Sequence, residues 1–236
     1  MVENLLFYCK FTKSLKEIGF KHNPYGPCVF NTFTTGSQTT ICFHVGDWNL
    51  SHWKKKDNDL MIKWLHKEYT SIFEDRSGKM AVSRGNLHVY LGMTLGYSIC
   101  GRFKITMFDY IEEIITAFDR AAPGKHITKS NVATINLFVV YEYCKKLNQI
   151  KVVALHNLVA KTLYATKRAR PDTFTPISLL MMRVREPDEE NWRKIIWLMR
   201  YLNGTRTLPM NLSANRSGIL KWWVDASFTF HPNMWG

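Results

Sequence analysis

The sequence predicts an α+β fold from two observations. Between residues 26 and 107, short apolar runs alternate with glycine-containing turns, which indicates β-strands, and most of the chain beyond residue 150 has helical apolar spacing. The composition can supply a core for such a fold, because 46% of the 236 residues are hydrophobic and 14% are aromatic. We therefore expect one large domain or two small ones, and we do not expect a disordered chain.

The charge of the chain indicates its partners. A formal net charge of +13 and a pI of about 9.6 favour a polyanion, with nucleic acid first and an acidic membrane surface second. Charge of this kind is also found in basic proteins that are merely soluble, and that alternative stays open.

Cysteine usage and hydropathy predict the compartment. The five cysteines are scattered and odd in number, and no two have the spacing of a CxxC motif, which is typical of reduced thiols in an intracellular protein. Glu3 stands where a signal peptide needs a basic residue, and no apolar run approaches the ~18 residues of a membrane span. We expect a soluble, non-secreted protein of the cytoplasm or nucleus that does not enter a membrane.

The first part of the chain predicts a helix followed by a β-meander. Residues 2–18 have the spacing of an amphipathic helix that ends at Gly19. Residues 28–33 and 38–45 read as two strands joined across Thr35-Gly36, and residues 48–51 can return as a third.

Gly46 and Asp47 lie between the second and third of these strands. Gly-Asp is a recognised two-residue hairpin signal, because glycine accepts a positive φ at the first central position without a Cβ clash. The local pattern by itself favours an ordinary hairpin tip with a solvated Asp47. A functional interpretation of Asp47 depends on the longer pattern around it.

Helical spacing and strand-like runs continue along the rest of the chain. The predicted helices span residues 53–69, 108–118, 151–168, 173–184 and 188–203. We expect one side of the first to carry Leu60, Met61, Trp64, Leu65 and Tyr69. The predicted strands span residues 80–82, 87–95, 102–107, 208–213 and 219–224. Residues 121–129, which contain Pro123-Gly124, form the best candidate linker.

Several short strings, taken in order, match a known family. They are Pro-Cys-Val-Phe at 27–30, His-Val-Gly-Asp at 44–47, Leu-Gly-Met at 91–93, Arg-Pro-Asp at 170–172, Arg-Tyr-Leu-Asn-Gly-Thr at 200–205 and Val-Asp-Ala-Ser at 224–227. Each string is weak alone, but together they cover nearly the whole chain. In this order they resemble the reverse transcriptase and ribonuclease H region of copia-type retrotransposon Gag-Pol polyproteins.

The resemblance implies an architecture and an activity. It implies a partial reverse transcriptase palm with its following strands at 1–120, a helical connection region at 121–207, and a truncated start of a ribonuclease H-like sheet at 208–236. The parent activity is RNA-directed DNA polymerisation, with degradation of the copied RNA. The resemblance also implies that this chain is one part of a longer polyprotein, and that the strand carrying the first catalytic aspartate is missing.

The metal chemistry of the family is not fully matched. Nucleotidyl transfer in this class uses two Mg²⁺ ions, which need several converging carboxylates. In the family two aspartates stand at the palm hairpin, whereas this chain has Gly46 and Asp47. Asp57 and Asp59 follow on the next helix, but we do not expect them to reach the hairpin tip. Asp225 matches the first metal ligand of ribonuclease H, and Ser227 replaces an acidic residue of that motif.

Basic residues are the remaining candidates for function. The cations that could follow a phosphate backbone without reading sequence are Lys54, Lys55, Lys56, Lys167, Arg168, Arg170 and Arg200. They could equally form a solvated surface that keeps the chain soluble.

Three functional hypotheses follow. The first is a copia-type reverse transcriptase fragment that is catalytically inactive, with Asp47 and Asp225 as remnants of metal sites that no longer bind Mg²⁺ productively. The second is a non-catalytic module that binds RNA–DNA hybrids or single strands through its basic residues. The third is a chain without any selected activity.

Overall fold

The computed structural model describes residues 2–73, 80–97, 101–125, 127–214 and 217–219. The chain divides into two compact units, residues 1–84 and residues 85–236, each with its own core. The division falls after Arg84, and the candidate linker at 121–129 lies within the second unit. Among the described residues, no helix combines the length and the apolar character that crossing a membrane would require.

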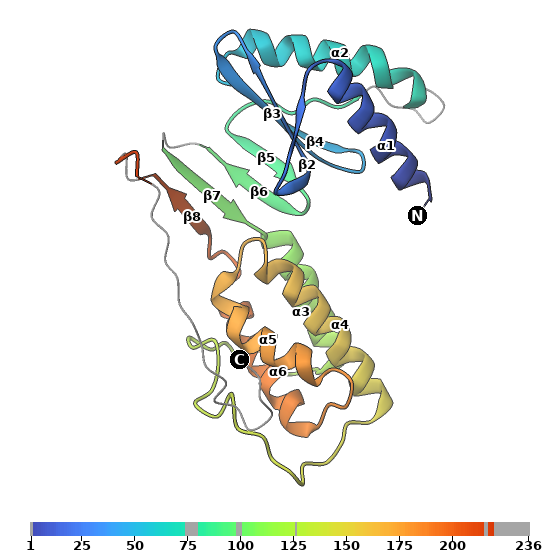
Figure 1. The fold of residues 1–236 in the computed structure, drawn as a ribbon. Helices are drawn as coiled ribbons and strands as arrows, with labels where there is room; N and C mark the ends of the chain where they lie inside the picture. The colour runs from blue at the N-terminus through green and yellow to red at the C-terminus, as the bar shows by residue number, and fades with distance from the viewer. Residues whose placement is uncertain (1, 74–79, 98–100, 126, 215–216, 220–236) are drawn as a thin grey trace. The chain divides into compact units, whose positions relative to one another are not determined.

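Unit 1 is an antiparallel β-meander with two helices. Its elements are α1 (Val2–Glu17), β1 (Lys21–Asn23), β2 (Gly26–Thr34), β3 (Ser37–His44), β4 (Asp47–Ser51) and α2 (Lys55–Phe73) (Figure 1). The strands are hydrogen-bonded in the order β1-β2-β3-β4. The predicted N-terminal helix and the meander are therefore confirmed.

Alternation along the strands of unit 1 places its core on one face of the sheet. Phe30 on β2 and Phe43 on β3 are buried with Phe11 of α1 and Tyr69 of α2, and the Phe11 and Phe43 rings meet edge to face at 4.7 Å. Met61, Leu65 and Tyr69 of the predicted apolar side of α2 are buried and Trp64 packs against them. Leu60 was wrongly predicted for that side: its side chain is 55% exposed.

The hairpin between β3 and β4 differs from the predicted turn. His44 pairs with Asp47, so the two-residue loop is Val45-Gly46 and Asp47 is the first residue of β4. The positive φ of this turn, 50°, falls on Val45. The register is decided by the pair Phe43 and Trp48, which both pack into the core, because a shift of one residue would turn them to the outer face.

Unit 2 contains a second antiparallel sheet. Its strands are β5 (Leu87–Tyr90), β6 (Met93–Gly96), β7 (Arg102–Thr106) and β8 (Met210–Ser213), in that spatial order. The predicted single run at 87–95 is two strands, because Leu91 and Gly92 form a hairpin turn with φ of 52° and 74°. The predicted strand at 80–82 is wrong, since these residues have no regular secondary structure.

The last strand of this sheet comes from far along the chain. β8 pairs with β7, from Arg102 opposite Ser213 to Ile105 opposite Met210. Residues 210–213 were predicted to open a separate sheet, but they complete the one that residues 87–106 begin. The predicted strand at 219–224 lies almost entirely outside the described residues.

Helices form the rest of unit 2. They are α3 (Phe108–Ala121), α4 (Gln149–Thr166), the short 3₁₀ turn η2 (Pro171–Thr173), α5 (Phe174–Arg183) and α6 (Glu189–Gly204). Asn148 caps α4 by accepting from the Lys151 backbone N–H, and Asp188 forms a capping box with Asn191 at the start of α6. The predicted helices at 151–168, 173–184 and 188–203 are confirmed within a few residues. Their buried faces join Leu95 and Ile105 of the sheet in one core.

A long segment without helix or strand connects α3 to α4 and is tied to α6. The Lys129 backbone N–H donates to the Arg200 carbonyl at 3.2 Å, and the Trp197 indole N–H donates to the Asn131 carbonyl at 2.9 Å. The Lys194 ammonium donates to the Val139 carbonyl at 2.7 Å. Because these three contacts are spread over about two turns of α6, the segment is held along the helix.

Candidate nucleic-acid interface

The hairpin tip of unit 1 carries Asp47 on its surface. Asp47 is exposed at the start of β4, and Gly46 beside it has no side chain to offer a ligand. Asp57, the nearest carboxylate along the chain, is directed elsewhere: it accepts from the Thr35 hydroxyl at 2.6 Å and lies 3.4 Å from His52 Nδ1. Thr35 belongs to the other hairpin, between β2 and β3. As predicted, Asp57 does not reach the Asp47 tip.

These donors do not fit the two magnesium ions that the family would imply. Mg²⁺ is held octahedrally by hard oxygen ligands, so more than one carboxylate must converge on it. Asp59, also on α2, forms an ion pair with Arg84. The helix that follows Asp47 therefore adds no second carboxylate ligand beside it. In the described ranges, no group of three or more His, Cys, Asp or Glu side chains could hold a metal ion. Asp225 lies outside those ranges.

The three lysines that precede and open α2 have different surroundings. Lys54 is half-buried, donates to the Thr35 carbonyl at 3.3 Å and lies 5.3 Å above the Trp53 ring. Lys55 and Lys56 are exposed in the first turn of the helix. Cations there oppose the helix dipole, so an anion that contacted them would also meet the positive end of α2. Lys55 and Lys56 are therefore available for phosphate.

Arg168 and Lys167 lie at the C-terminal end of α4 in unit 2. The Arg168 guanidinium stacks on Tyr164, 3.4 Å from the ring centroid, and donates to the Tyr164 carbonyl at 3.3 Å. The Tyr164 hydroxyl donates to the Leu91 carbonyl at 3.0 Å, which ties α4 to the β5–β6 hairpin. Burial raises the pKa of Tyr110, whose ring lies 5.1 Å from that of Tyr164. Lys167 is exposed, so this end of α4 presents a cation beside a fixed aromatic stack.

Arg170 is not part of the predicted phosphate-binding set, because it is buried. Its side chain is 1% exposed and makes a two-pronged contact with Asp172, with Nη2 to Oδ2 at 2.7 Å and Nε to Oδ1 at 3.0 Å. The same guanidinium donates to the Thr205 carbonyl at 3.0 Å and to the Thr205 hydroxyl at 2.7 Å. A planar guanidinium with four such bonds acts as an internal clamp.

The partners of Arg170 connect two of the strings noted in the sequence. Tyr201 donates its hydroxyl to Asp172 Oδ2 at 2.7 Å, so Arg-Pro-Asp at 170–172 is bonded to Arg-Tyr-Leu-Asn-Gly-Thr at 200–205. Burial alone would raise the pKa of Asp172, but the hydrogen bonds from Arg170 and Tyr201 outweigh it and lower that pKa. We call Arg170, Asp172, Tyr201 and Thr205 the Arg170 clamp; Arg170 and Tyr201 are buried, Thr205 is half-buried and Asp172 remains partly accessible. The Arg170 clamp joins the end of α6 to the α4–α5 connection.

Arg200 is only partly available for contact with a phosphate. Its Nε donates to the Lys125 carbonyl at 3.3 Å, and its side chain is half-buried. Of the basic residues predicted to follow a phosphate backbone, the structure leaves Lys55, Lys56 and Lys167 exposed. It holds Lys54, Arg168 and Arg200 at the surface through contacts with the protein, and it buries Arg170.

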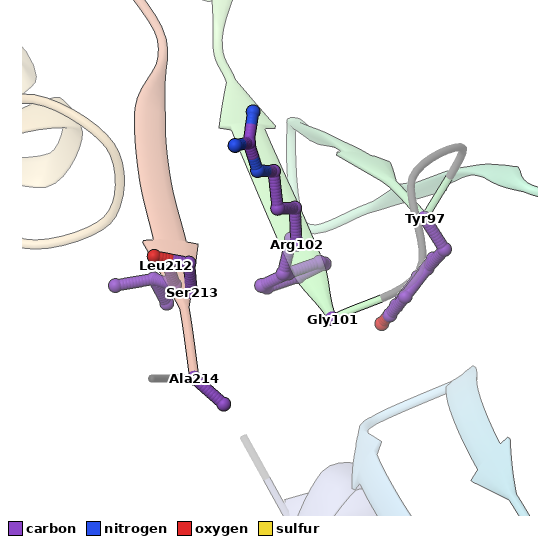
Figure 2. A pocket seen from close by; sticks show the side chains of 7 residues that line it. Tyr97, Gly101, Arg102, Leu212, Ser213 and Ala214 are labelled. Atoms are coloured by element: carbon purple, nitrogen blue, oxygen red, sulfur yellow. The ribbon is translucent and has the colours of Figure 1, made fainter. Parts of the chain in front are cut away.

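The sheet of unit 2 adds cations that the prediction missed. Arg102 and Lys104 are exposed on β7, whereas Phe103 and Ile105, which alternate with them, face the core. Arg102 also lines an open hollow of about 580 Å³, shown in Figure 2, at the ends of β7 and β8. The hollow is lined by Tyr97, Gly101, Arg102, Phe103, Leu212, Ser213 and Ala214. The alternation Arg-Phe-Lys at 102–104 was the signal available in the sequence.

An aromatic pair stands in this hollow. The Tyr97 and Phe103 rings lie 4.7 Å apart at an interplanar angle of 31°. Burial raises the pKa of the Tyr97 phenol, so the ring stays neutral well above physiological pH. Phe103 packs against the core, whereas Arg102 lies on the other face of β7 and its guanidinium extends away from the Tyr97 ring in Figure 2. The exposed Tyr97 ring is therefore the side chain of this hollow on which a flat ligand could stack.

A retrotransposon protein is similar to nearly the whole chain. The Retrovirus-related Pol polyprotein from transposon TNT 1-94 of Nicotiana tabacum is 24% identical over 224 residues, which make up 93% of this chain. These residues span 16% of the relative. No family model and no solved structure matches the chain. The similarity supports an origin in a retrotransposon polyprotein.

Proposed function

We propose that this chain is a module derived from a reverse transcriptase that binds nucleic acid and does not catalyse nucleotidyl transfer. The observation that carries the proposal is the contrast at the surface: exposed cations lie on each unit, while the β3–β4 hairpin presents Asp47 next to Gly46. The similarity to a Pol polyprotein supports an origin in a retrotransposon polyprotein. In its parent protein the module would be one part of a longer polyprotein.

Loss of catalysis is supported by the ligand geometry of unit 1. A two-ion mechanism positions the attacking and leaving oxygens through carboxylates that bridge both ions. Val45-Gly46 forms the hairpin loop where the resemblance implies a second aspartate, and Asp57 is engaged by Thr35 and His52. One exposed carboxylate leaves most of an octahedral shell to water, which gives weak binding and no fixed distance between two ions.

Binding is supported by the placement of the cations on both units. Lys55 and Lys56 in unit 1, and Lys167, Arg102 and Lys104 in unit 2, are exposed. Contacts of lysine or arginine with phosphate cannot distinguish one base from another, because the phosphate backbone is the same for every sequence. We therefore propose binding to single strands or RNA–DNA hybrids without sequence preference.

A primer-extension assay tests the loss of catalysis. The full chain is incubated with a primed RNA template and deoxynucleotides, once with Mg²⁺ and once with Mn²⁺, and we expect no extension with either ion. The matched control is the Asp47→Asn variant. Template-dependent synthesis that this substitution abolishes would overturn the proposal that the hairpin is inactive.

Fluorescence anisotropy with a labelled single strand tests binding. For the five exposed cations on a single strand, affinity should fall about 10²-fold between about 50 and 200 mM salt, because bound counterions are released. The double variant Arg102→Gln/Lys104→Gln should weaken binding and lower the slope of log K against log salt by about 0.7 for each lost contact.

The control for this assay changes the net charge equally at another place. Lys13 and Lys146 are exposed, and each forms an ion pair at the surface. The double variant Lys13→Gln/Lys146→Gln should keep the wild-type slope. If the two double variants lose affinity equally, net charge explains the binding and the β7 surface is not the site. Absence of binding at low salt would favour a chain without selected activity.

A further inference from the structure

The sheet of unit 1 has an outer face, opposite to the one that packs on α1 and α2. Because side chains alternate along a strand, Asn31 and Phe33 of β2 lie on this face, whereas Phe30 between β1 and β3 points into the core. In the ladder Asn31 is opposite Thr40 of β3, and Phe33 is opposite Gln38. Residues that are opposite each other share a face, so these four side chains are neighbours. We call Asn31, Phe33, Gln38 and Thr40 the 31–40 site.

Hydrogen bonds orient the two amides of the 31–40 site. Gln38 Nε2 donates to Asn31 Oδ1 at 3.1 Å and to the Thr40 hydroxyl at 3.0 Å, and this hydroxyl donates to Asn31 Oδ1 at 2.9 Å. The two hydrogens of Gln38 Nε2 are used in this way, so Gln38 can accept through Oε1, and Asn31 can donate through Nδ2. The site therefore presents a donor next to an acceptor, and both are oriented before a ligand arrives.

Phe33 supplies an aromatic ring beside these amides. Its side chain is 76% exposed, so the ring is accessible to a ligand. Side chains on a strand stand roughly perpendicular to the sheet, and a flat ligand stacked on the ring would direct one edge toward the sheet. Asn31 lies two residues away on the same strand and Gln38 lies opposite, so both amides can meet that edge. A nucleobase has this chemistry, with a flat face for stacking and donors and acceptors along its edge.

Cations lie at the same end of the sheet. Lys21 of β1 is opposite Asn31 in the ladder and is exposed. The Lys54 ammonium lies 3.3 Å from the carbonyl of Thr35, in the turn that joins β2 to β3. Asp57 also contacts this turn, but its side chain is 9% exposed and accepts from the Thr35 hydroxyl. A phosphate attached to a base in the 31–40 site would therefore meet positive charge.

We infer that the 31–40 site holds one unpaired nucleobase, with the Phe33 ring on its face and the amides of Asn31 and Gln38 on its Watson–Crick edge. Such a site rests on the proposed binding of nucleic acid, and it selects the single strand over the RNA–DNA hybrid. In a hybrid the Watson–Crick edge of every base is occupied by its partner, and both faces are stacked within the helix. Each of the bases has a donor and an acceptor on that edge, so the site accepts any sequence.

A preference for the single strand is the opposite of what charge alone would give. A double helix carries phosphates at a higher density than a single strand and releases more counterions for each contact. Cations without a base site should therefore bind the hybrid at least as tightly as the single strand. The order of the two affinities thus distinguishes the 31–40 site from phosphate contacts elsewhere on the chain.

Fluorescence anisotropy on the full chain at about 50 mM salt tests this inference with three probes of about 12 nucleotides. They are a single strand, the blunt RNA–DNA hybrid of the same sequence, and a strand of sugar-phosphate units without bases. We expect the single strand to bind most tightly. Phe33→Ala should weaken its binding about fivefold or more, because one stacked base is lost. The double variant Asn31→Ala/Gln38→Ala should weaken it about fivefold or more, because two hydrogen bonds are lost. Neither variant should change the affinity for the other two probes.

The control is Tyr25→Ala, which removes another exposed ring of unit 1. Tyr25 is 96% exposed in the turn between β1 and β2, at the end of β2 far from Phe33. This variant should bind all three probes like the wild type, and circular dichroism checks that every variant is folded.

Three outcomes would overturn the 31–40 site and leave the proposed function intact. They are a hybrid that binds as tightly as the single strand, a site variant that keeps the wild-type affinity for the single strand, and equal losses in Phe33→Ala and Tyr25→Ala. If none of the probes binds, the proposed function is wrong and the site is wrong with it.

Discussion

Asp47 of unit 1 and Asp172 of unit 2 both lie in strings that resemble the same family, and their surroundings differ. Asp47 is exposed at a hairpin tip, beside a glycine and opposite His44. Asp172 accepts hydrogen bonds from the buried side chains of Arg170 and Tyr201, and these bonds lower its pKa. The Asp47 carboxylate faces solvent, whereas the Asp172 carboxylate is held by hydrogen bonds from other parts of unit 2.

The two surroundings correspond to two roles that a motif residue can have, which are binding a ligand and stabilising the fold. A residue that binds a metal or a substrate must remain accessible and needs partners from other elements at the same point. A residue that stabilises a fold needs partners that exclude water. Asp172 meets the second requirement, whereas Asp47 is accessible but lacks converging carboxylates among the described residues. The strings at 170–172 and 200–205 therefore identify a structural clamp.

The largest expected effect comes from breaking the clamp. Replacement Arg170→Met removes a buried cation that bonds both Asp172 and Thr205, and it should cost about 3–5 kcal/mol of unfolding free energy. The matched control is Arg168→Met, two residues earlier, which loses a surface stacking contact with Tyr164 and should cost about 1 kcal/mol or less. Urea unfolding followed by circular dichroism measures both. Equal losses would show that the clamp does not stabilise unit 2.

An intermediate effect is expected from the two aspartates themselves. Asp172→Asn should cost about 1.5–3 kcal/mol at pH 7, because charge-assisted hydrogen bonds from Arg170 and Tyr201 are weakened. Asp47→Asn should stay within about 0.5 kcal/mol of the wild type, since Asp47 is exposed.

Acidification sharpens this comparison. The pKa of Asp172 is lowered in the folded protein, so its contribution is complete above the unfolded value of about 4 and is lost as pH falls through the folded pKa. The difference between wild type and Asp172→Asn should therefore shrink in acid. Urea midpoints measured from pH 7 down to pH 2 provide the test. A constant difference over this range would contradict the assignment.

The smallest expected effect comes from two glycines of the same strings. A Cβ at Gly204 would lie 3.1 Å from Thr128 Cβ and 3.3 Å from the Lys129 carbonyl oxygen. Gly204→Ala should therefore cost about 1 kcal/mol, as overpacking outweighs the gain in helix propensity. A Cβ at Gly46 would meet nothing within 4 Å, so Gly46→Ala should change stability by about 0.5 kcal/mol or less. Thermal unfolding of both variants checks this, and a reversed order would contradict it.

Much of the fold could be predicted because its signals are local. The glycine turns at Gly36 and Gly92 permit positive φ, and the apolar periods of α1, α4 and α6 indicate which segments are helical. The hairpin at Val45-Gly46 was misplaced by one residue, because its register depends on the burial of Phe43 and Trp48. Leu60 was placed on the wrong side of α2 because 3.6-residue spacing alone does not locate the edge of an apolar face.

The candidate site depended more on contacts between distant residues. A sequence shows that Arg168 and Arg170 are both basic, but it does not show that one stacks on the surface and the other is enclosed. The exposed residues Arg102 and Lys104 were missed because the sequence does not show which face of β7 packs on the core, and the opposite face is the exposed one.

The sequence by itself determined the helices, the strand-forming runs, the surplus of basic residues and the replacement of a metal ligand by Gly46, since these are properties of single residues or of short periods. Tertiary structure decided the pairing of β8 with β7 and the enclosure of Arg170. Each of these depends on which residues, far apart along the chain, exclude water from one another.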